Sequence, residues 1–146
     1  MSASAFLQVQ AALVAALEAQ PTLAGVPVHK NRTRTLPREE AAAVLVRLAT
    51  SRDDGSMLGC SDWATDFDVE AVARATSGAD PAAAVDELLQ ALWAALHAIT
   101  GANILDAAAD PQIVWAFDAA DTAQASAKLR VSVRHRTQLN TLTPWS

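Results

Sequence analysis

The sequence predicts an α+β fold, with a mostly antiparallel sheet of about four to five strands and two main helices packed on one face of that sheet. Two stretches repeat apolar residues at the spacing of an amphipathic helix. Other stretches alternate apolar and polar residues, which is the period of a half-buried strand. The 146 residues fit one domain, expected over residues 1–137 and followed by a loose tail at 138–146.

The first helix is predicted over about residues 4–20, and Pro21 ends it. A short extended piece begins at residue 25. Residues 29–40 carry no apolar period, so we expect a long exposed loop there. The apolar stripe of the helix consists of Phe6, Val9, Leu13 and Leu17.

Two strands are predicted next, forming a long hairpin. The first covers residues 43–49, the second covers about residues 61–75, and residues 51–56 have the composition of a turn. One face of the second strand is apolar and the other is acidic. The acidic residues are Asp62, Asp66, Asp68 and Glu70.

A second helix is predicted to begin at Pro81, with Asp80 as its N-cap and Gly101 as its stop. A second hairpin follows, with strands near residues 113–118 and 127–137. Its last strand has a basic face, formed by Lys128, Arg130, Arg134 and Arg136.

The composition excludes several classes of protein. The 11 basic and 16 acidic residues give a net charge of −5, which is the wrong sign for a protein that grips phosphates. Cys60 is the single cysteine, so an intramolecular disulfide is impossible. No apolar run approaches the roughly 20 residues that span a bilayer, so we expect no membrane contact.

The sequence contains no convincing catalytic or metal-binding pattern. Cys60 would need a histidine partner, and His29, His97 and His135 lie on different predicted elements. No metal-ligand spacing and no glycine-rich phosphate loop is present. We therefore expect no enzyme activity and no cofactor. The tryptophans at positions 63, 93 and 115 are expected to pack in the core.

The acidic and basic strand faces leave two interpretations open. They pair across neighbouring strands of one chain, which is worth a few tenths of a kcal/mol per pair. Alternatively, they meet between subunits and give a head-to-tail ring.

The order of elements and several segments resemble the tail terminator proteins of long-tailed bacteriophages, the lambda-type minor tail protein U family. The resemblance covers nearly the whole chain. It rests on packing patterns: the N-terminal helix that ends near Gln20-Pro21-Thr22-Leu23, the central hairpin, Gly78-Ala79-Asp80-Pro81, Val114-Trp115-Ala116-Phe117-Asp118, and the final strand from Ala127 to Thr137.

The resemblance implies a structural virion protein that assembles in the host cytoplasm. Such proteins form a homohexameric ring on the head-proximal end of the tail tube, stop tube polymerisation and provide the surface for head attachment. The implied partners are the chain itself, the tail tube protein and the head–tail connector protein. DNA passes through the ring without specific binding, which suits an acidic surface.

Candidate contact residues follow from expected exposure. The two charged loops offer contacts to ring neighbours or to the tube, and the acidic face is a candidate for the lumen or a subunit contact, with the basic face as its complement. The loop residues are Arg32, Arg34, Arg38, Arg52, Asp53 and Asp54.

Two alternatives compete with this interpretation. One is another neck component, a head–tail joining or tail-completion protein. The other is a small α+β ligand-binding module or enzyme, which would need polar residues pointing inward.

Overall fold

The computed structural model of the chain describes residues 3–32, 40–101, 103–118, 120–121 and 123–145. The chain folds in the predicted order of helix, short strand, hairpin, helix and hairpin. The elements are α1 (Ala5–Glu18), the short 3-10 helix η1 (Pro21–Leu23), β1 (Val28–Lys30), β2 (Ala42–Met57), β3 (Cys60–Arg74), α2 (Pro81–Leu96), β4 (Ile104–Phe117) and β5 (Gln124–Gln138).

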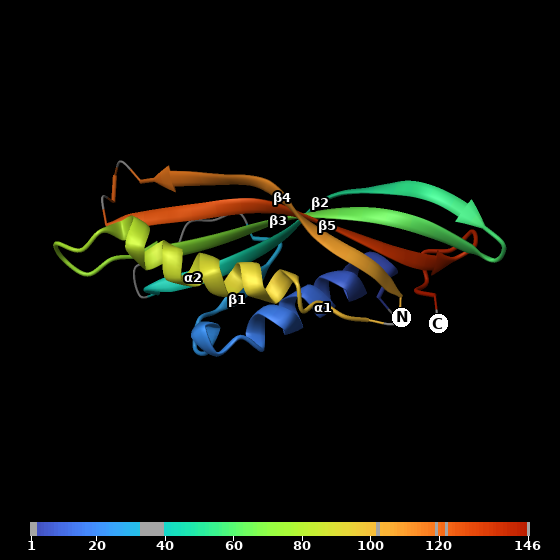
Figure 1. Cartoon of the computed structure of the whole chain (residues 1–146), viewed down its shortest axis with the longest axis horizontal. Coiled ribbons are helices and arrows are strands. Elements are labelled where there is room, and N and C mark those ends of the chain that lie inside the picture. Colours follow the sequence, from blue (N-terminus) through green and yellow to red (C-terminus); the bar gives the residue numbers. More distant parts are fainter. Residues whose placement is uncertain (1–2, 33–39, 102, 119, 122, 146) are drawn as a thin grey trace.

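The strands form a five-stranded sheet in the order β1-β2-β3-β5-β4. Three of the pairings are antiparallel, as expected for most of the sheet, whereas β1 and β2 run parallel, so the sheet is mixed. The two hairpins join through β3 and β5, which lie side by side along their whole length. The sheet is long and twisted, and the β2–β3 turn lies at the opposite end of the molecule from the start of α2 (Figure 1).

One hydrophobic cluster joins the two helices to the sheet. Apolar residues of α1 and α2 pack with alternate residues of β2, β3 and β5. These strand residues face the same side of the sheet because they are paired directly across neighbouring strands. Phe67 is the largest fully buried side chain, and Leu48 and Val131 lie opposite it on the neighbouring strands.

The first hairpin is longer than the sequence predicts, and the predicted turn at residues 51–56 is wrong. This segment continues β2, and the chain turns at Leu58 and Gly59. Two bulges accommodate the turn-forming residues within the strand. Gly55 lies at the second bulge with φ of 129°, and its backbone N–H donates to the Asp53 carboxylate at 2.8 Å.

Strand β4 begins at Ile104, well before the predicted start near residue 113. Its register against β5 shifts between Ala109 and Ile113, so residues 110–112 bulge out of the pairing. The bulge contains Pro111. A proline is tolerated there because β4 is an edge strand, where a missing N–H costs no ladder hydrogen bond.

Helix α2 has the predicted start and a different end. The Asp80 carboxylate accepts a hydrogen bond from the backbone N–H of Ala82 at 3.0 Å, and Pro81 occupies the first turn. The helix ends at Leu96 with His97 as its C-cap, so Gly101 is not the stop. Ser4 stands at the N-cap of α1 without a side-chain capping hydrogen bond.

Residues 138–145, expected as a loose tail, fold back over the end of the sheet. The backbone N–H groups of Gln138 and Trp145 donate to Thr143 and Arg136, and that of Ala5 donates to Leu142 at 2.8 Å. The two chain ends therefore lie close together (Figure 1). In the described part of the chain, neither helix is long and apolar enough to cross a membrane.

Candidate functional site

The acidic row of β3 lies on the sheet face opposite the main hydrophobic cluster, next to a small second cluster of Ala43, Leu45 and Val72. Asp62, Asp66, Asp68 and Glu70 alternate along the strand with Trp63, Thr65, Phe67 and Val69, and the last two of these belong to the hydrophobic cluster. The position of the acidic row therefore follows directly from the two-residue period of the strand.

The basic row of β5 lies directly beside the acidic row. The register places Asp62 opposite Arg136, Asp68 opposite Arg130, and Glu70 opposite Lys128. Arg136 Nε lies 2.7 Å from Asp62 Oδ1, and Arg130 Nε lies 3.1 Å from Asp68 Oδ1. The hydrogen bond from Arg136 holds the pKa of the Asp62 carboxyl below its ordinary value.

Strand β2 supplies partners for the other two acids. Arg47 Nη2 lies 3.2 Å from Glu70 Oε2, and Arg52 Nη1 lies 3.5 Å from Asp66 Oδ2. Thr50 also donates to Asp66 at 3.2 Å. Each acid of the row therefore has a basic partner within its own chain.

This pairing bears on the first of the two interpretations of the charged rows, contact within one chain. The sequence left equal room for contacts within a chain and for contacts between complementary faces of two subunits. The structure joins the two rows directly in two places, Asp62–Arg136 and Asp68–Arg130. The other two acids pair with Arg47 and Arg52 of β2. A role of either row as a lumen or subunit-contact face stays a prediction.

Arg134 extends the network to the hairpin tip and to β4. Its Nη1 lies 2.8 Å from Asp106 Oδ2, and its Nε lies 3.4 Å from Asp54 Oδ2. The two carboxylates raise the pKa of Arg134, and the effect of Asp106 is the larger. The charged face thus carries ion pairs on β2, β3, β5 and β4, and Arg134 contacts two acids.

The six residues assigned to charged loops have different settings. Arg52, Asp53 and Asp54 lie in strand β2 and not in a loop. Arg32 is exposed, and its carbonyl oxygen accepts a hydrogen bond from Arg47 at 3.2 Å. Arg34 and Arg38 lie outside the described residues.

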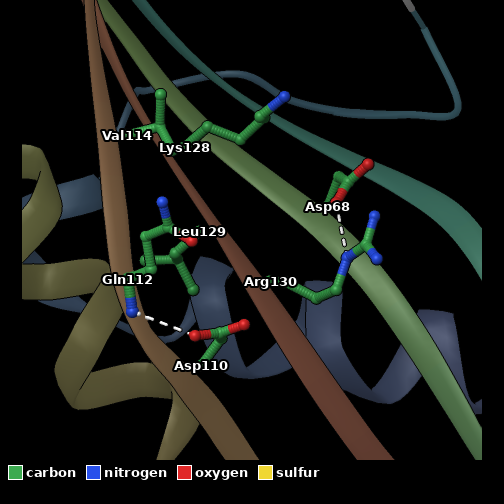
Figure 2. A pocket seen from close by; sticks show the side chains of 7 residues that line it. All are labelled: Asp68, Asp110, Gln112, Val114, Lys128, Leu129 and Arg130. Carbon is green, nitrogen blue, oxygen red and sulfur yellow. Dashed lines mark hydrogen bonds and ion pairs between the residues drawn. The ribbon is translucent and has the colours of Figure 1, made fainter.

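Shallow hollows interrupt the charged face where β4 bulges. One, of about 240 Å³, is lined by residues of β3, β4 and β5, including Asp68, Asp110, Lys128 and Arg130. Figure 2 shows the Asp68–Arg130 pair on one side of this hollow and Asp110, with Gln112, on the other. The lining mixes both charge signs, so it offers a polar protein contact and no obvious small-molecule site.

Nucleophilic and metal chemistry finds no support in the described residues. Cys60 is buried, and no hydrogen bond in this part of the chain joins it to a histidine. No group of three or more histidine, cysteine or acidic side chains in the described ranges could hold a metal ion. His135 is fully buried, with its Nε2 2.7 Å from Thr65 Oγ1.

Exposed aromatic residues are the feature that the sequence interpretation missed. Trp93 and Trp115 were expected in the core, but each is about two fifths exposed, and Phe117 is 62% exposed. Trp115 and Phe117 do face the helix side of the sheet, opposite Ala127 and Ala125. These two side chains remain partly exposed to solvent because β4 is the edge strand and α2 covers only part of it. Five uncharged residues in a row, from Ile113 to Phe117, were the available signal.

The hairpin tip at the other end of the molecule is also apolar. Leu58 is fully exposed and Met57 is largely exposed. The folded-back tail adds more apolar surface there, since the backbone N–H of Leu139 donates to the Gly59 carbonyl at 3.1 Å. Large apolar side chains are therefore exposed at this tip as well as on β4 around Phe117.

Comparisons with known proteins bear on the fold. No protein-family model and no curated protein matches the sequence. A solved chain from the virion of a native gene transfer agent particle superposes with a TM-score of 0.62 at 17% identity, over 88% of this chain and 94% of that one. A chain from the cryo-EM structure of an extracellular contractile injection system, described as the PVC sheath/tube terminator in the extended state, gives 0.50 at 12% identity. That match covers 100% of this chain and 62% of the other. The chain therefore has a fold that occurs in a gene transfer agent virion and in a sheath/tube terminator.

Proposed function

We propose that this protein is a structural component of a phage tail or related particle, and that it terminates the tail tube. In this role it forms a ring on the head-proximal end of the tube, ends polymerisation and offers the surface to which the head attaches. The observation that carries the proposal is the fold likeness to a sheath/tube terminator, which extends over the whole chain. The sequence resemblance to the lambda-type terminator family points the same way.

The geometry suits a passive scaffold better than a catalyst. The charged sheet face is held together by ion pairs on four strands, and its hollows are shallow. Enzyme activity and a cofactor play no part in the proposal. The location that follows from it is the virion, after assembly in the host cytoplasm.

Termination requires two different surfaces on one subunit. Tube subunits stack so that each ring presents the same surface to the next, and this geometry never ends by itself. A terminator must match the tube on one side and present something else on the other. The hairpin tip around Leu58 and the end of β4 around Phe117 are two separate exposed apolar surfaces that are available for two different partners. We assign the tube and connector contacts to these ends and to the charged residues near them.

DNA passage is compatible with the charges. The net charge of −5 disfavours tight phosphate binding, and many of the basic side chains are occupied by acidic partners. DNA is therefore expected to pass such a ring without specific binding.

The decisive experiment is deletion of the gene. Loss of a terminator gives headless tails with tubes longer than normal, and purified protein added to tails of the correct length restores joining to filled heads. Charge reversal of Arg32, Arg34 and Arg38 together is expected to weaken capping while the circular dichroism spectrum and Tm stay unchanged. Reversal of Glu18, an exposed acid on α1, is the matched control.

A different result would support the second candidate. Normal-length tails that fail to join heads would indicate a head–tail joining or tail-completion protein. Shape and charge allow this neck component equally well, because it too needs two unlike faces and no chemistry.

A further inference from the structure

Charges are strongly segregated along the chain. Residues 19–38 contain four basic residues and no acid: Lys30, Arg32, Arg34 and Arg38. Residues 75–127 contain no lysine or arginine and seven acids: Asp80, Asp86, Glu87, Asp106, Asp110, Asp118 and Asp121. Such long runs of one sign indicate two surfaces of opposite potential.

The described parts of these two segments supply the strands at opposite edges of the sheet. The basic segment includes β1, which is one outermost strand, and the acidic segment includes β4, which is the other. Helix α2 also belongs to the acidic segment and contacts β3, β5 and β4. We call the β1 side, with Lys30 and Arg32, the basic edge. We call the β4–α2 side, with Asp86 and Glu87, the acidic edge.

Most of this charge is not neutralised within the described part of the chain. Asp106 and Asp121 pair with Arg134 and Arg74. Asp86 and Glu87 are exposed, and none of the ion pairs among the described residues includes them. Lys30 and Arg32 are exposed and equally outside those ion pairs. The edges thus differ from the sheet face, where acid and base satisfy each other.

The acidic edge also contains an apolar groove. The groove has a volume of about 320 Å³ and is lined by Leu89, Gln90, Trp93 and Ile113. Gln90 donates to the Asp86 carboxylate at 2.8 Å, which places that acid at the rim. An exposed indole beside a carboxylate suits the long apolar stems and cationic heads of lysine and arginine, through cation–π contact and ion pairing together.

We infer that the basic edge of one copy of this chain docks on the acidic edge of a second copy. Charge complementarity identifies a second copy as the occupant, because none of the ion pairs among the described residues joins Lys30 or Arg32 to Asp86 or Glu87 within one chain. Pairing like edges would bring acid against acid, so a two-fold contact is disfavoured. The contact is heterologous and leaves one free edge at each end, so it repeats from copy to copy, and it closes into a ring when the rotation between neighbouring copies divides a full turn.

The inference builds on the proposed terminator ring by naming the surfaces that join its subunits. It adds contact surfaces to the acidic and basic strand faces, two of whose charge pairs form within the chain. The β2–β3 turn, which contains the exposed Leu58, lies at one end of the long axis (Figure 1) and stays available for other partners.

Zero-length cross-linking tests the contact directly. Equal amounts of unlabelled and ¹⁵N-labelled full-length protein are mixed at low salt and treated with a carbodiimide, which joins an amine to a carboxylate in direct contact. We expect mixed-isotope peptide pairs that link Lys30 to Asp86 or Glu87. Intermolecular links that use only other acids, or the absence of mixed-isotope pairs, would overturn the inference.

Charge exchange supplies the second arm. The substitution D86K, and separately K30E, should each weaken self-association on the order of tenfold at low salt, measured by sedimentation velocity. Both substitutions in one chain should restore association, because the edges are then complementary again. Glu18→Lys and Lys128→Glu are the controls, and each should leave self-association unchanged. A monomer at every concentration and salt, or equal association of all variants, contradicts the proposal.

The two proposals fail separately. A protein that caps tubes although these edge variants behave like the wild type remains a terminator with a different subunit contact. A protein that associates through these edges but leaves tube length unaffected retains the edge contact and loses the terminator function. Raised salt should weaken the edge contact, because the Debye length falls from about 8 Å at about 0.15 M ionic strength to about 3 Å at about 1 M.

Discussion

Protonation of His135 should destabilise the fold between neutral and mildly acidic pH. The side chain is fully buried, with its Nε2 2.7 Å from Thr65 Oγ1, which in turn lies 2.9 Å from Ser51 Oγ. Phe6 packs edge-on at a ring-centroid distance of 5.6 Å. The Nδ1 atom has no hydrogen-bond partner among the described residues. A protonated ring would therefore bury a second N–H without an acceptor.

The size of the effect follows from the two pKa values. Burial lowers the pKa of His135 to about 4 from the ordinary value of 6.5. The unfolded chain binds the proton more tightly, so stability is unaffected by this group above pH 6.5 and falls as the pH drops from 6.5 toward 4. The loss amounts to about 2 kcal/mol at pH 5 and about 3 kcal/mol below pH 4.

Urea denaturation at pH 8, 7, 6 and 5, followed by tryptophan fluorescence, measures this loss. The matched variant is His135→Gln, whose side-chain amide can still reach Thr65 and does not titrate. We expect the wild type to lose about 2 kcal/mol between pH 8 and pH 5. The variant should show a nearly flat profile, and His97→Gln, at an exposed position, should retain the wild-type slope. Parallel profiles for the wild type and the His135 variant would refute the reasoning.

Three further substitutions test the packing and the ion pairs, each by urea denaturation at pH 7. Asp62→Asn should cost about 1 kcal/mol, because it removes the charge from a mostly buried pair with Arg136, whereas Asp53→Asn at an exposed position should stay within about 0.5 kcal/mol. Phe67→Ala should cost about 3–5 kcal/mol, since the ring is fully buried; a smaller loss would show that the core relaxes around it. Cys60→Ser should cost at most about 1–2 kcal/mol and leave assembly intact, while loss of infectivity with normal folding would reveal a role for the thiol.

The element order could be predicted because it depends on local periods. The apolar stripes of both helices and the alternation in β3 and β5 are properties of short windows of sequence. The Asp80-Pro81 start of α2 is equally local, and the structure contains the expected cap. These signals place each element without any knowledge of its neighbours.

The errors arise where tertiary pairing overrides a local preference. Residues 51–56 have turn composition, yet pairing with β3 keeps them extended, and Gly55 absorbs the irregularity at a bulge. Trp115 alternates like a core residue, but its strand lies at the edge of the sheet, where α2 does not cover it. An apolar period identifies a face of a strand and cannot tell whether another element covers that face.

Strand order determines whether the acidic row and the basic row lie next to each other. The sequence shows an acidic strand and a basic strand and cannot say whether they are neighbours. The structure places β3 beside β5 in a register that sets Asp62 against Arg136 and Asp68 against Arg130. A shift of one residue would have moved one row to the other face of the sheet and left both rows unpaired. The candidate subunit contact therefore depended on a fact that no local pattern contains.

Internal pairing of the sheet face has a consequence for assembly under the proposed function. A terminator subunit must remain dispersed until a tube end is available, and then join its neighbours in a fixed order. A face with its charges satisfied adds little attraction between free subunits, and exposed polar contacts such as Lys30 with Asp86 are weak and sensitive to salt. A tube end that holds several subunits side by side raises their effective concentration, so the same weak edges then close the ring. We therefore expect ring formation to depend on the tube end at moderate salt, and on low salt or high concentration in its absence.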